Sequence, residues 1–272
     1  MKVLAIDTAT ENCSAAVLVD GSVQSREIEM ERGHAERILP MVDAVLAQAG
    51  ITLRDLDAIA FGRGPGSFTG VRLAVTVTQG LAFGANLGVV PISDLRAVAQ
   101  RAFRADSTLT RVLVCNDARM SEVYWACFER GGDGLARLEG EERVSKPSEV
   151  KLPPTWSTAT AVGRGFIAYA DALRAAVGGA VRVDSPPATP AGVELDERGA
   201  PAGLDAAAAP APTAPVGAGS LFHLLPHAID IALLAAPEVA AGRLLTAEAA
   251  TPIYLRDNVA HVAQPKAPAT PP

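Results

Sequence analysis

Apolar runs and amphipathic stretches alternate along the first hundred residues. The runs at 3–6, 14–19 and 23–30 are typical of strands, and Asp20-Gly21 between the last two predicts a hairpin turn. Helices and strands then alternate in the pattern: a helix over 35–48, a strand over 57–61, a helix over 71–83, a strand over 89–92 and a helix over 94–104.

The same order of elements begins again near residue 111. We expect strands at 111–116, 122–129 and 135–143, a short polar helix after Lys146, a strand at 159–163, a helix at 166–176, a strand at 181–183 and a last helix at 224–234. Two successive α/β halves of similar layout suggest a duplicated domain. We therefore place the first subdomain at 1–107 and the second at 108–185 together with 220–260.

A segment rich in Ala, Pro and Gly interrupts the second half at residues 186–219. Such a composition cannot bury enough apolar surface to order itself. We interpret it as an insertion in a surface loop, where doubling the loop length costs only about 0.6 kcal/mol. Residues 261–272 are Pro-rich and are expected to form a flexible tail.

Composition limits the classes of partner. The chain has 272 residues, a net charge of −6 and only 4% aromatic residues. It therefore lacks both a global basic field that would attract a phosphate backbone and a supply of aromatic platforms for bases. Direct binding of RNA is disfavoured.

Features that would indicate secretion or a membrane span are weak. The three cysteines, Cys13, Cys115 and Cys127, form no CxxC pair and lie in apolar strands, which predicts buried thiols in a reducing cytosol. The N-terminal apolar run is too short for a signal peptide. The uncharged window 73–93 divides into a helix, a turn and a strand. We expect a cytoplasmic protein that does not enter the membrane.

A glycine-rich stretch at 62–70 precedes the second helix. It is neither a Walker A loop nor a GxGxxG fingerprint, although glycines that open a helix can present N–H groups to a phosphate. The favoured interpretation is a tight strand-to-helix turn in which Ser67 or Thr69 caps the helix.

The helix after this turn is apolar nearly all round. Its faces consist of Val71, Ala74, Val75, Thr78 and Ala82 on one side and of Leu73, Val77, Leu81 and Gly84 on another. One face can lie on the sheet of its own subdomain, and the other needs a second layer or another protein. The pattern supports both alternatives equally.

Few side chains indicate catalysis. Asp7 ends the first strand, where a carboxylate can hold a metal-bound water but more often caps a turn. Asp117 and Arg119 occupy the matching place in the second half, and Arg119 could pair with either aspartate as a link between the halves. Pro226 separates His223 from His227, and no HExxH pattern accompanies them, so we expect no metal there.

Five segments together resemble the TsaB (YeaZ) family. They are LAIDTAT (4–10), HAERILP (34–40), GPGSFTGVR (64–72), DARM with EVY (117–120 and 122–124), and PIYLRD (252–257). They occur in the order of the family, and the resemblance covers about 1–185 and 220–260. The string GPGSFTGVR is the most specific element.

The resemblance implies a duplicated actin-like ATPase fold (ASKHA, sugar kinase/Hsp70-type), with two α/β subdomains that contain mixed sheets. It also implies a non-catalytic scaffold that pairs with the TsaD paralogue, while the TsaE-type ATPase joins the complex. That machinery makes threonylcarbamoyladenosine at position 37 of tRNAs that read codons starting with A. ATP and metal are expected on the partner subunits, with no cofactor in this chain. We expect tRNA contact only through partners, and a homodimer when the chain is alone, because an open apolar face will find cover.

The resemblance also places the sites. The implied partner interface consists of His34, Arg37, Ile38, Met41, Arg72, Leu73, Val77 and Leu81. The implied turn and cleft residues are Asp7, Gly64, Gly66, Ser67, Thr69, Asp117 and Arg119.

Two departures from active relatives predict a degenerate nucleotide cleft. The catalytic paralogue carries a histidine metal motif shortly after its glycine-rich helix, whereas this chain has VVPISDLR at 89–96. The turn at 117–119 lacks the glycine that would let a backbone approach a phosphate. The alternative is an active nucleotide-binding kinase or a metallopeptidase of the same fold.

Overall fold

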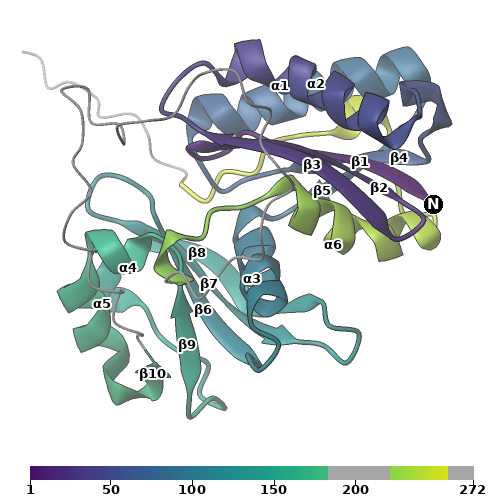
Figure 1. Cartoon of the computed structure of the whole chain (residues 1–272). Helices are drawn as coiled ribbons and strands as arrows, with labels where there is room; N and C mark the ends of the chain where they lie inside the picture. Colours follow the sequence, from purple (N-terminus) through teal and green to yellow (C-terminus); the bar gives the residue numbers. More distant parts are fainter. Residues whose placement is uncertain (183–220, 257–272) are drawn as a thin grey trace, which may run out of the picture.

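Two mixed five-stranded sheets form the framework of the chain, and the computed structural model describes residues 1–182 and 221–256 (Figure 1). The first sheet has the order β3-β2-β1-β4-β5. Its strands are β1 (Lys2–Asp7), β2 (Asn12–Val19), β3 (Ser22–Glu29), β4 (Ala58–Gly62) and β5 (Gly88–Ile92).

The second sheet repeats this topology with the order β10-β9-β6-β7-β8. Its strands are β6 (Arg111–Asp117), β7 (Val123–Arg130), β8 (Ala136–Ser145), β9 (Ala159–Val162) and β10 (Val181–Arg182). In both sheets the first three strands along the chain are antiparallel and the last two run parallel to the first. The duplication predicted from the sequence is confirmed, and the fold is the duplicated actin-like one.

Six helices and five short 3₁₀ turns connect the strands in the described residues. The helices are α1 (His34–Ala49), α2 (Phe68–Ala85), α3 (Asp94–Ala105), α4 (Gly165–Ala168), α5 (Ala170–Val177) and α6 (Ala228–Ala240). The 3₁₀ turns are η1 (Leu53–Asp55), η2 (Pro147–Glu149), η3 (Gly178–Ala180), η4 (Leu221–His223) and η5 (Ala247–Ala249).

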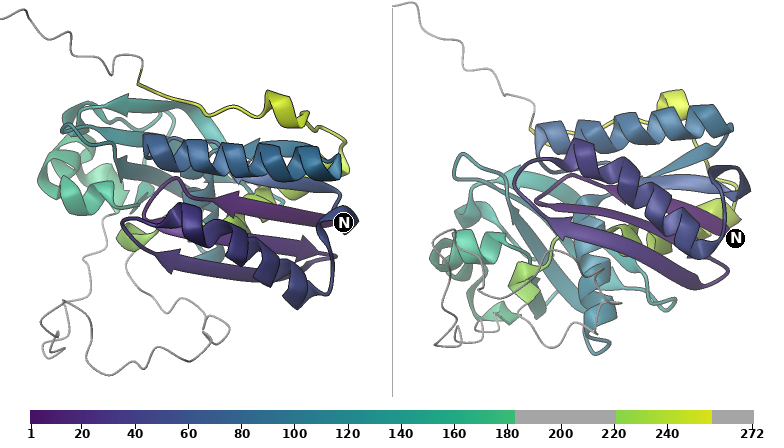
Figure 2. Two further views of the ribbon diagram at one scale, coloured as in Figure 1. Left: turned by 90° about the horizontal axis from the view of Figure 1, so that it is seen from above. Right: turned by 45° about the horizontal axis from the view of Figure 1, so that its top comes forward.

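The elements form five layers around three apolar clusters. Helices α1 and α2 cover one face of the first sheet, and α4 and α5 lie on the outer side of the second (Figures 1 and 2). Helices α3 and α6 lie between the two sheets, where the central cluster contains Phe103 of α3 and Ile231 of α6. The inner strands are thus buried on both faces, whereas the edge strands β3 and β8 remain partly exposed.

The middle layer exchanges helices between the halves. Helix α6, at the end of the chain, packs against β1, β2, β4 and β5, whereas α3 packs against the strands of the second sheet. The expectation that residues 220–260 complete the second subdomain is therefore wrong for α6. The boundary at 107 also separates α3 from the sheet that it covers. The order of helices and strands along the chain does not predict which of the two sheets the last helix of each half will cover.

Two predicted helices differ from the structure near their ends. The last helix begins at Ala228 rather than 224, because Pro226 precedes it and the His227 ring accepts a hydrogen bond from the N–H of Ile229 as its N-cap. The helix predicted at 166–176 is two helices that meet at Tyr169. The insertion expected at 186–219 and the tail expected at 261–272 lie outside the described residues.

Other predictions from composition are confirmed. All three cysteines are free and buried in strands, and burial raises the pKa of the Cys13 and Cys127 thiols to about 12. The window 73–93 is divided between α2 and β5. Within residues 1–182 and 221–256, no helix is long and apolar enough to cross a membrane.

Candidate functional site

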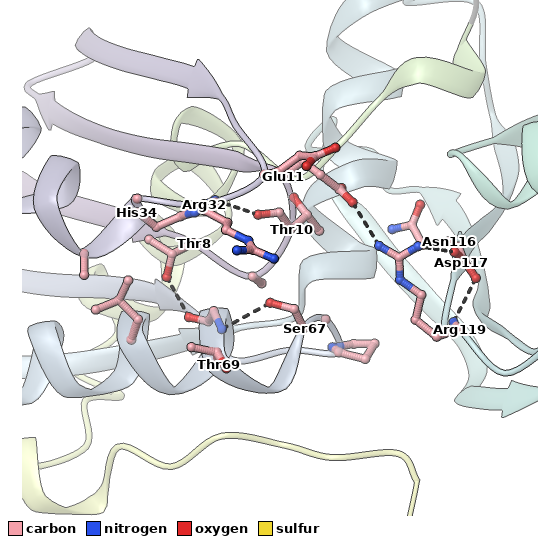
Figure 3. A pocket seen from close by; sticks show the side chains of 18 of the residues that line it. Thr8, Thr10, Glu11, Arg32, His34, Ser67, Thr69, Asn116, Asp117 and Arg119 are labelled. Atoms are coloured by element: carbon pink, nitrogen blue, oxygen red, sulfur yellow. Dashed lines mark hydrogen bonds and ion pairs between the residues drawn. The ribbon is translucent and has the colours of Figure 1, made fainter.

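A cavity of about 550 Å³ opens where the N-termini of α1 and α2 face the loop between β6 and β7 (Figure 3). Five of the seven predicted turn and cleft residues line it: Gly66, Ser67, Thr69, Asp117 and Arg119. Asp7 and Gly64 are buried beneath it instead. The cavity also includes side chains that the sequence did not indicate, among them Glu11, Arg32 and Asn116.

The glycine-rich stretch forms the floor of the cavity as a tight turn. Ser67 caps α2, since its hydroxyl accepts a hydrogen bond from Gly70 N at 3.1 Å, and its own N–H donates to Ala9 O at 2.7 Å. A Cβ added at Gly66 would lie 2.5 Å from Ala9 O. The glycines therefore let two segments of backbone approach each other, and the favoured interpretation of the stretch as a structural turn is confirmed.

Asp7 does not reach the cavity, because it is fully buried against Asp94. Its Oδ1 accepts from Ala9 N at 2.9 Å, which confirms the turn-capping role, and Asp94 accepts from Gly64 N. Burial, and then the charge of Asp7, raises the pKa of Asp94 well above its ordinary value. The remaining oxygens, Asp7 Oδ2 and Asp94 Oδ1, lack other partners in the described part of the chain. Through Ala9 N and Gly64 N, the two carboxyl groups connect the end of β1 and the glycine-rich turn to the start of α3.

Charged side chains cross the cleft between the two halves. Arg119 lies 3.2 Å from Asp117 and 3.6 Å from Glu11 (Figure 3). Arg164, at the start of α4, lies 3.8 Å from Glu11 and 2.6 Å from Glu29. A second cavity of about 250 Å³ beside these groups includes Asn116 and Ile167 among its walls. Arg119 does link the halves, but through Glu11 rather than Asp7.

The loop that carries Arg119 has an unusual backbone. Arg119, Met120 and Ser121 have φ values of 62°, 55° and 60°, so three consecutive residues other than glycine are left-handed. This conformation costs roughly 1–2 kcal/mol per residue. Arg256 holds the loop: its guanidinium donates to Ala118 O at 3.1 Å and to the Glu122 carboxylate.

Two histidines, His34 and His227, have structural partners. His34 Nε2 lies 2.9 Å from Thr10 O at the cavity wall. His227 Nε2 lies 3.1 Å from Glu27 Oε2 while its Nδ1 caps α6. No group of three or more His, Cys, Asp or Glu side chains that could hold a metal occurs among the residues described.

The predicted interface residues divide by exposure. Arg37 and Arg72 are exposed, and five are partly exposed: His34, Met41, Leu73, Val77 and Leu81. Ile38 has no exposed surface, because it lies on the face of α1 that packs on the first sheet with Val42 and Val45. Its assignment to a partner interface is wrong.

The side of α2 that faces away from the sheet includes Gly84 of the predicted second apolar face and Arg72 of the predicted interface, together with three residues that the sequence did not indicate. Arg72, Thr76, Gly80, Phe83 and Gly84 are all exposed there, and we call them the open face of α2. Phe83 is 74% exposed. Among residues 1–182 and 221–256, nothing lies within 4 Å of a Cβ built on Gly80 or Gly84. The signal in the sequence that could have revealed this face is the pair Gly80 and Gly84, which lie about one helical turn apart in α2.

Comparisons with known proteins agree with the motifs. A family model described as TsaD, tRNA N6-adenosine threonylcarbamoyltransferase, matches residues 27–170. The tRNA threonylcarbamoyladenosine biosynthesis protein TsaB of Escherichia coli is 38% identical over 265 residues, which are 96% of each chain. TsaB of Haemophilus influenzae is 51% identical over 178 residues, 62% of this chain and 74% of that protein. The crystal structure of YeaZ from Pseudomonas aeruginosa is 38% identical, superposes with a TM-score of 0.72 and covers 93% of this chain and 99% of its own.

Proposed function

The chain belongs to the TsaB family, and on that basis we propose that it is a non-catalytic scaffold in the formation of threonylcarbamoyladenosine in tRNA. It binds a TsaD-type paralogue, and the TsaE-type ATPase joins through the complex. The modified base is adenosine 37 of tRNAs that read codons starting with A. The protein acts in the cytoplasm, and tRNA reaches it only through its partners.

The open face of α2 carries this proposal. Glycine inside a helix costs about 1 kcal/mol relative to alanine, and no described residue of the chain packs against a Cβ position at Gly80 or Gly84. Small residues at this spacing let the backbone of a second helix approach closely. Phe83, exposed beside them, offers apolar area for the same contact. A partner helix laid along α2 accounts for all three residues.

Side chains in the cleft support the non-catalytic part of the proposal. In this fold the cleft between the halves is where a nucleotide would enter, and here Arg119 and Arg164 cross it to Glu11. Asp7, the carboxylate that ends β1, is engaged by Asp94 and has no exposed surface. The two arginines and Asp7 therefore contact other residues of this chain instead of facing a substrate.

Reconstitution tests the proposal. Threonylcarbamoyl transfer is measured with the TsaD-type and TsaE-type proteins of the same organism, by mass spectrometry of tRNA nucleosides, with and without this chain. We expect modified adenosine only when the chain is present. Equal modification without it would refute the scaffold role. Activity of the chain without the TsaD-type protein would support the alternative of an active enzyme.

A further inference from the structure

Three side chains form an exposed cluster at the N-terminal end of α2. The rings of Phe68 and Tyr254 stack with centroids 5.4 Å apart and planes at 29°. The Arg72 guanidinium lies 3.8 Å from the Phe68 centroid, and its Nε donates to Tyr254 Oη at 2.8 Å. Phe68 remains 54% exposed and Tyr254 40%. We call these three residues the aromatic–arginine cluster.

The positive charge of the cluster is not neutralised within the chain. Arg72 contacts two rings and one hydroxyl, and no carboxylate pairs with it in the part of the chain that the structure describes. A guanidinium stacked on rings has given up part of its hydration and keeps donors directed outward. It is therefore prepared to receive a carboxylate from outside.

The cluster is held in place by contacts made far along the chain. The segment that carries Tyr254 runs beside α2 (Figure 2), where Gln79 Nε2 donates to Ala250 O at 2.9 Å. The N–H of Ile253 donates to Arg63 O at 2.8 Å, and Arg256 holds the β6–β7 loop. The side chains of the cluster are thus ordered before any partner arrives, which lowers the entropic cost of binding.

Two further apolar side chains are exposed along the segment that carries Tyr254, one within it and one in contact with its Arg256. Ile253 is 40% exposed and Met120, whose sulfur lies 3.4 Å from Arg256 Nη1, is 61% exposed. Aromatic residues, methionine and arginine are the types enriched in the central part of protein interfaces, where a few residues supply most of the affinity. A single unpaired arginine on a chain of net charge −6 does not suit a nucleic-acid backbone.

We propose that the aromatic–arginine cluster anchors the interface of α2, by receiving a carboxylate on Arg72 and an adjoining apolar side chain on the Phe68 and Tyr254 rings. The occupant is the TsaD-type partner, because Arg72 belongs to the open face of α2 along which that partner is proposed to lie. The inference rests on the proposed function and adds to it that the C-terminal segment forms part of the interface.

Affinity for the TsaD-type partner tests the anchor, measured by titration calorimetry with the full chain. Arg72→Ala and Tyr254→Ala are each expected to weaken the complex at least about tenfold. Leu138→Ala is the matched control, because Leu138 is as exposed as Tyr254, 41% against 40%, but lies on β8 of the second sheet; we expect less than a threefold change. Arg174→Ala on α5 controls for loss of positive charge elsewhere.

The salt dependence of the affinity distinguishes loss of the charged contact from loss of folded protein. Raising the salt concentration should weaken the wild-type complex more than that of Arg72→Ala, because the variant lacks the ion pair. Arg72→Lys should be intermediate, since it keeps the charge and loses the planar stacking. Arg72→Ala changes no side chain of the C-terminal segment. If Tyr254→Ala lowers the stability of the chain, the affinity of Arg72→Ala still tests the anchor.

The outcomes distinguish the two proposals. If wild type binds and both Arg72→Ala and Tyr254→Ala bind as tightly as wild type, the anchor is refuted while the scaffold proposal stands. If wild type does not bind the TsaD-type protein at all, the proposed function itself fails.

Discussion

Replacing Gly80 with leucine should strengthen the chain and weaken its complex. The position is interior to α2, and a Cβ there meets nothing within 4 Å, so the larger residue gains helix propensity without a clash. The gain is about 0.7–1 kcal/mol, because leucine is nearly as good a helix former as alanine. For a domain of this size, that raises Tm by about 2–4 °C.

The same side chain would occupy the space that the proposed partner helix needs. Overpacking a contact costs about 1–3 kcal/mol, which is roughly a five- to 150-fold increase in Kd. The assay pairs thermal unfolding of the isolated variant with calorimetric titration of the TsaD-type protein. Gly179→Leu serves as control, because Gly179 also has open space around its Cβ but lies in η3 of the second half.

Two results would refute this reasoning. A lower Tm for Gly80→Leu would mean that the surface around the helix is not open. A higher Tm with unchanged Kd would mean that the open face of α2 is not the interface, and the exposed glycines would then need another explanation.

Three further predictions concern the buried charges and the cleft. Burial and the charge of Asp7 raise the pKa of Asp94, so the contribution of this group to stability is present at acidic pH and lost as pH rises through the folded-state pKa. Asp94→Asn should therefore gain stability relative to wild type in urea unfolding as pH increases, and a constant difference would contradict the raised pKa. The hydrogen bond from His227 lowers the pKa of Glu27 to about 2. The contribution of the Glu27 carboxylate to folding stability is therefore present above its ordinary pKa of 4.5 and is lost as pH falls from there toward 2. Glu27→Gln should cost stability at neutral pH and little at pH 2; equal loss at both would mean that the charge of the Glu27 carboxylate contributes nothing to stability. Calorimetry with ATP should show no micromolar binding to the isolated chain, whose cleft Arg119 crosses, and a micromolar Kd there would overturn the degenerate cleft.

Local patterns in the sequence predicted most of the framework. Each strand of the two sheets was expected within a few residues, because alternation and apolar runs are properties of neighbouring positions. Ser67 was one of two candidates for the cap of α2 for the same reason. The start of α6 was placed too early, since the apolar pattern continues through Pro226 whereas the helix begins after it.

Contacts between distant residues could not be predicted in this way. Asp7 and Asp94 meet because β1 and the start of α3 converge, and Arg119 found Glu11 rather than Asp7. Ile38 was misassigned because exposure depends on which side of α1 faces the sheet. Such pairings depend on how the elements are arranged in three dimensions. The periodicity of a single helix or strand carries no information about that arrangement.

The exchange of helices between the halves affects how the protein is made. Synthesis completes the last strand of the first sheet at Ile92, but α6, which covers its inner face, ends only at Ala240. At 5–20 residues per second, the nascent chain spends on the order of ten seconds or more with that apolar face unprotected. Helix α3, by contrast, is synthesised before the sheet that it covers, so the first half of the chain is the one that is completed last, and its uncovered sheet is open to binding by chaperones during synthesis.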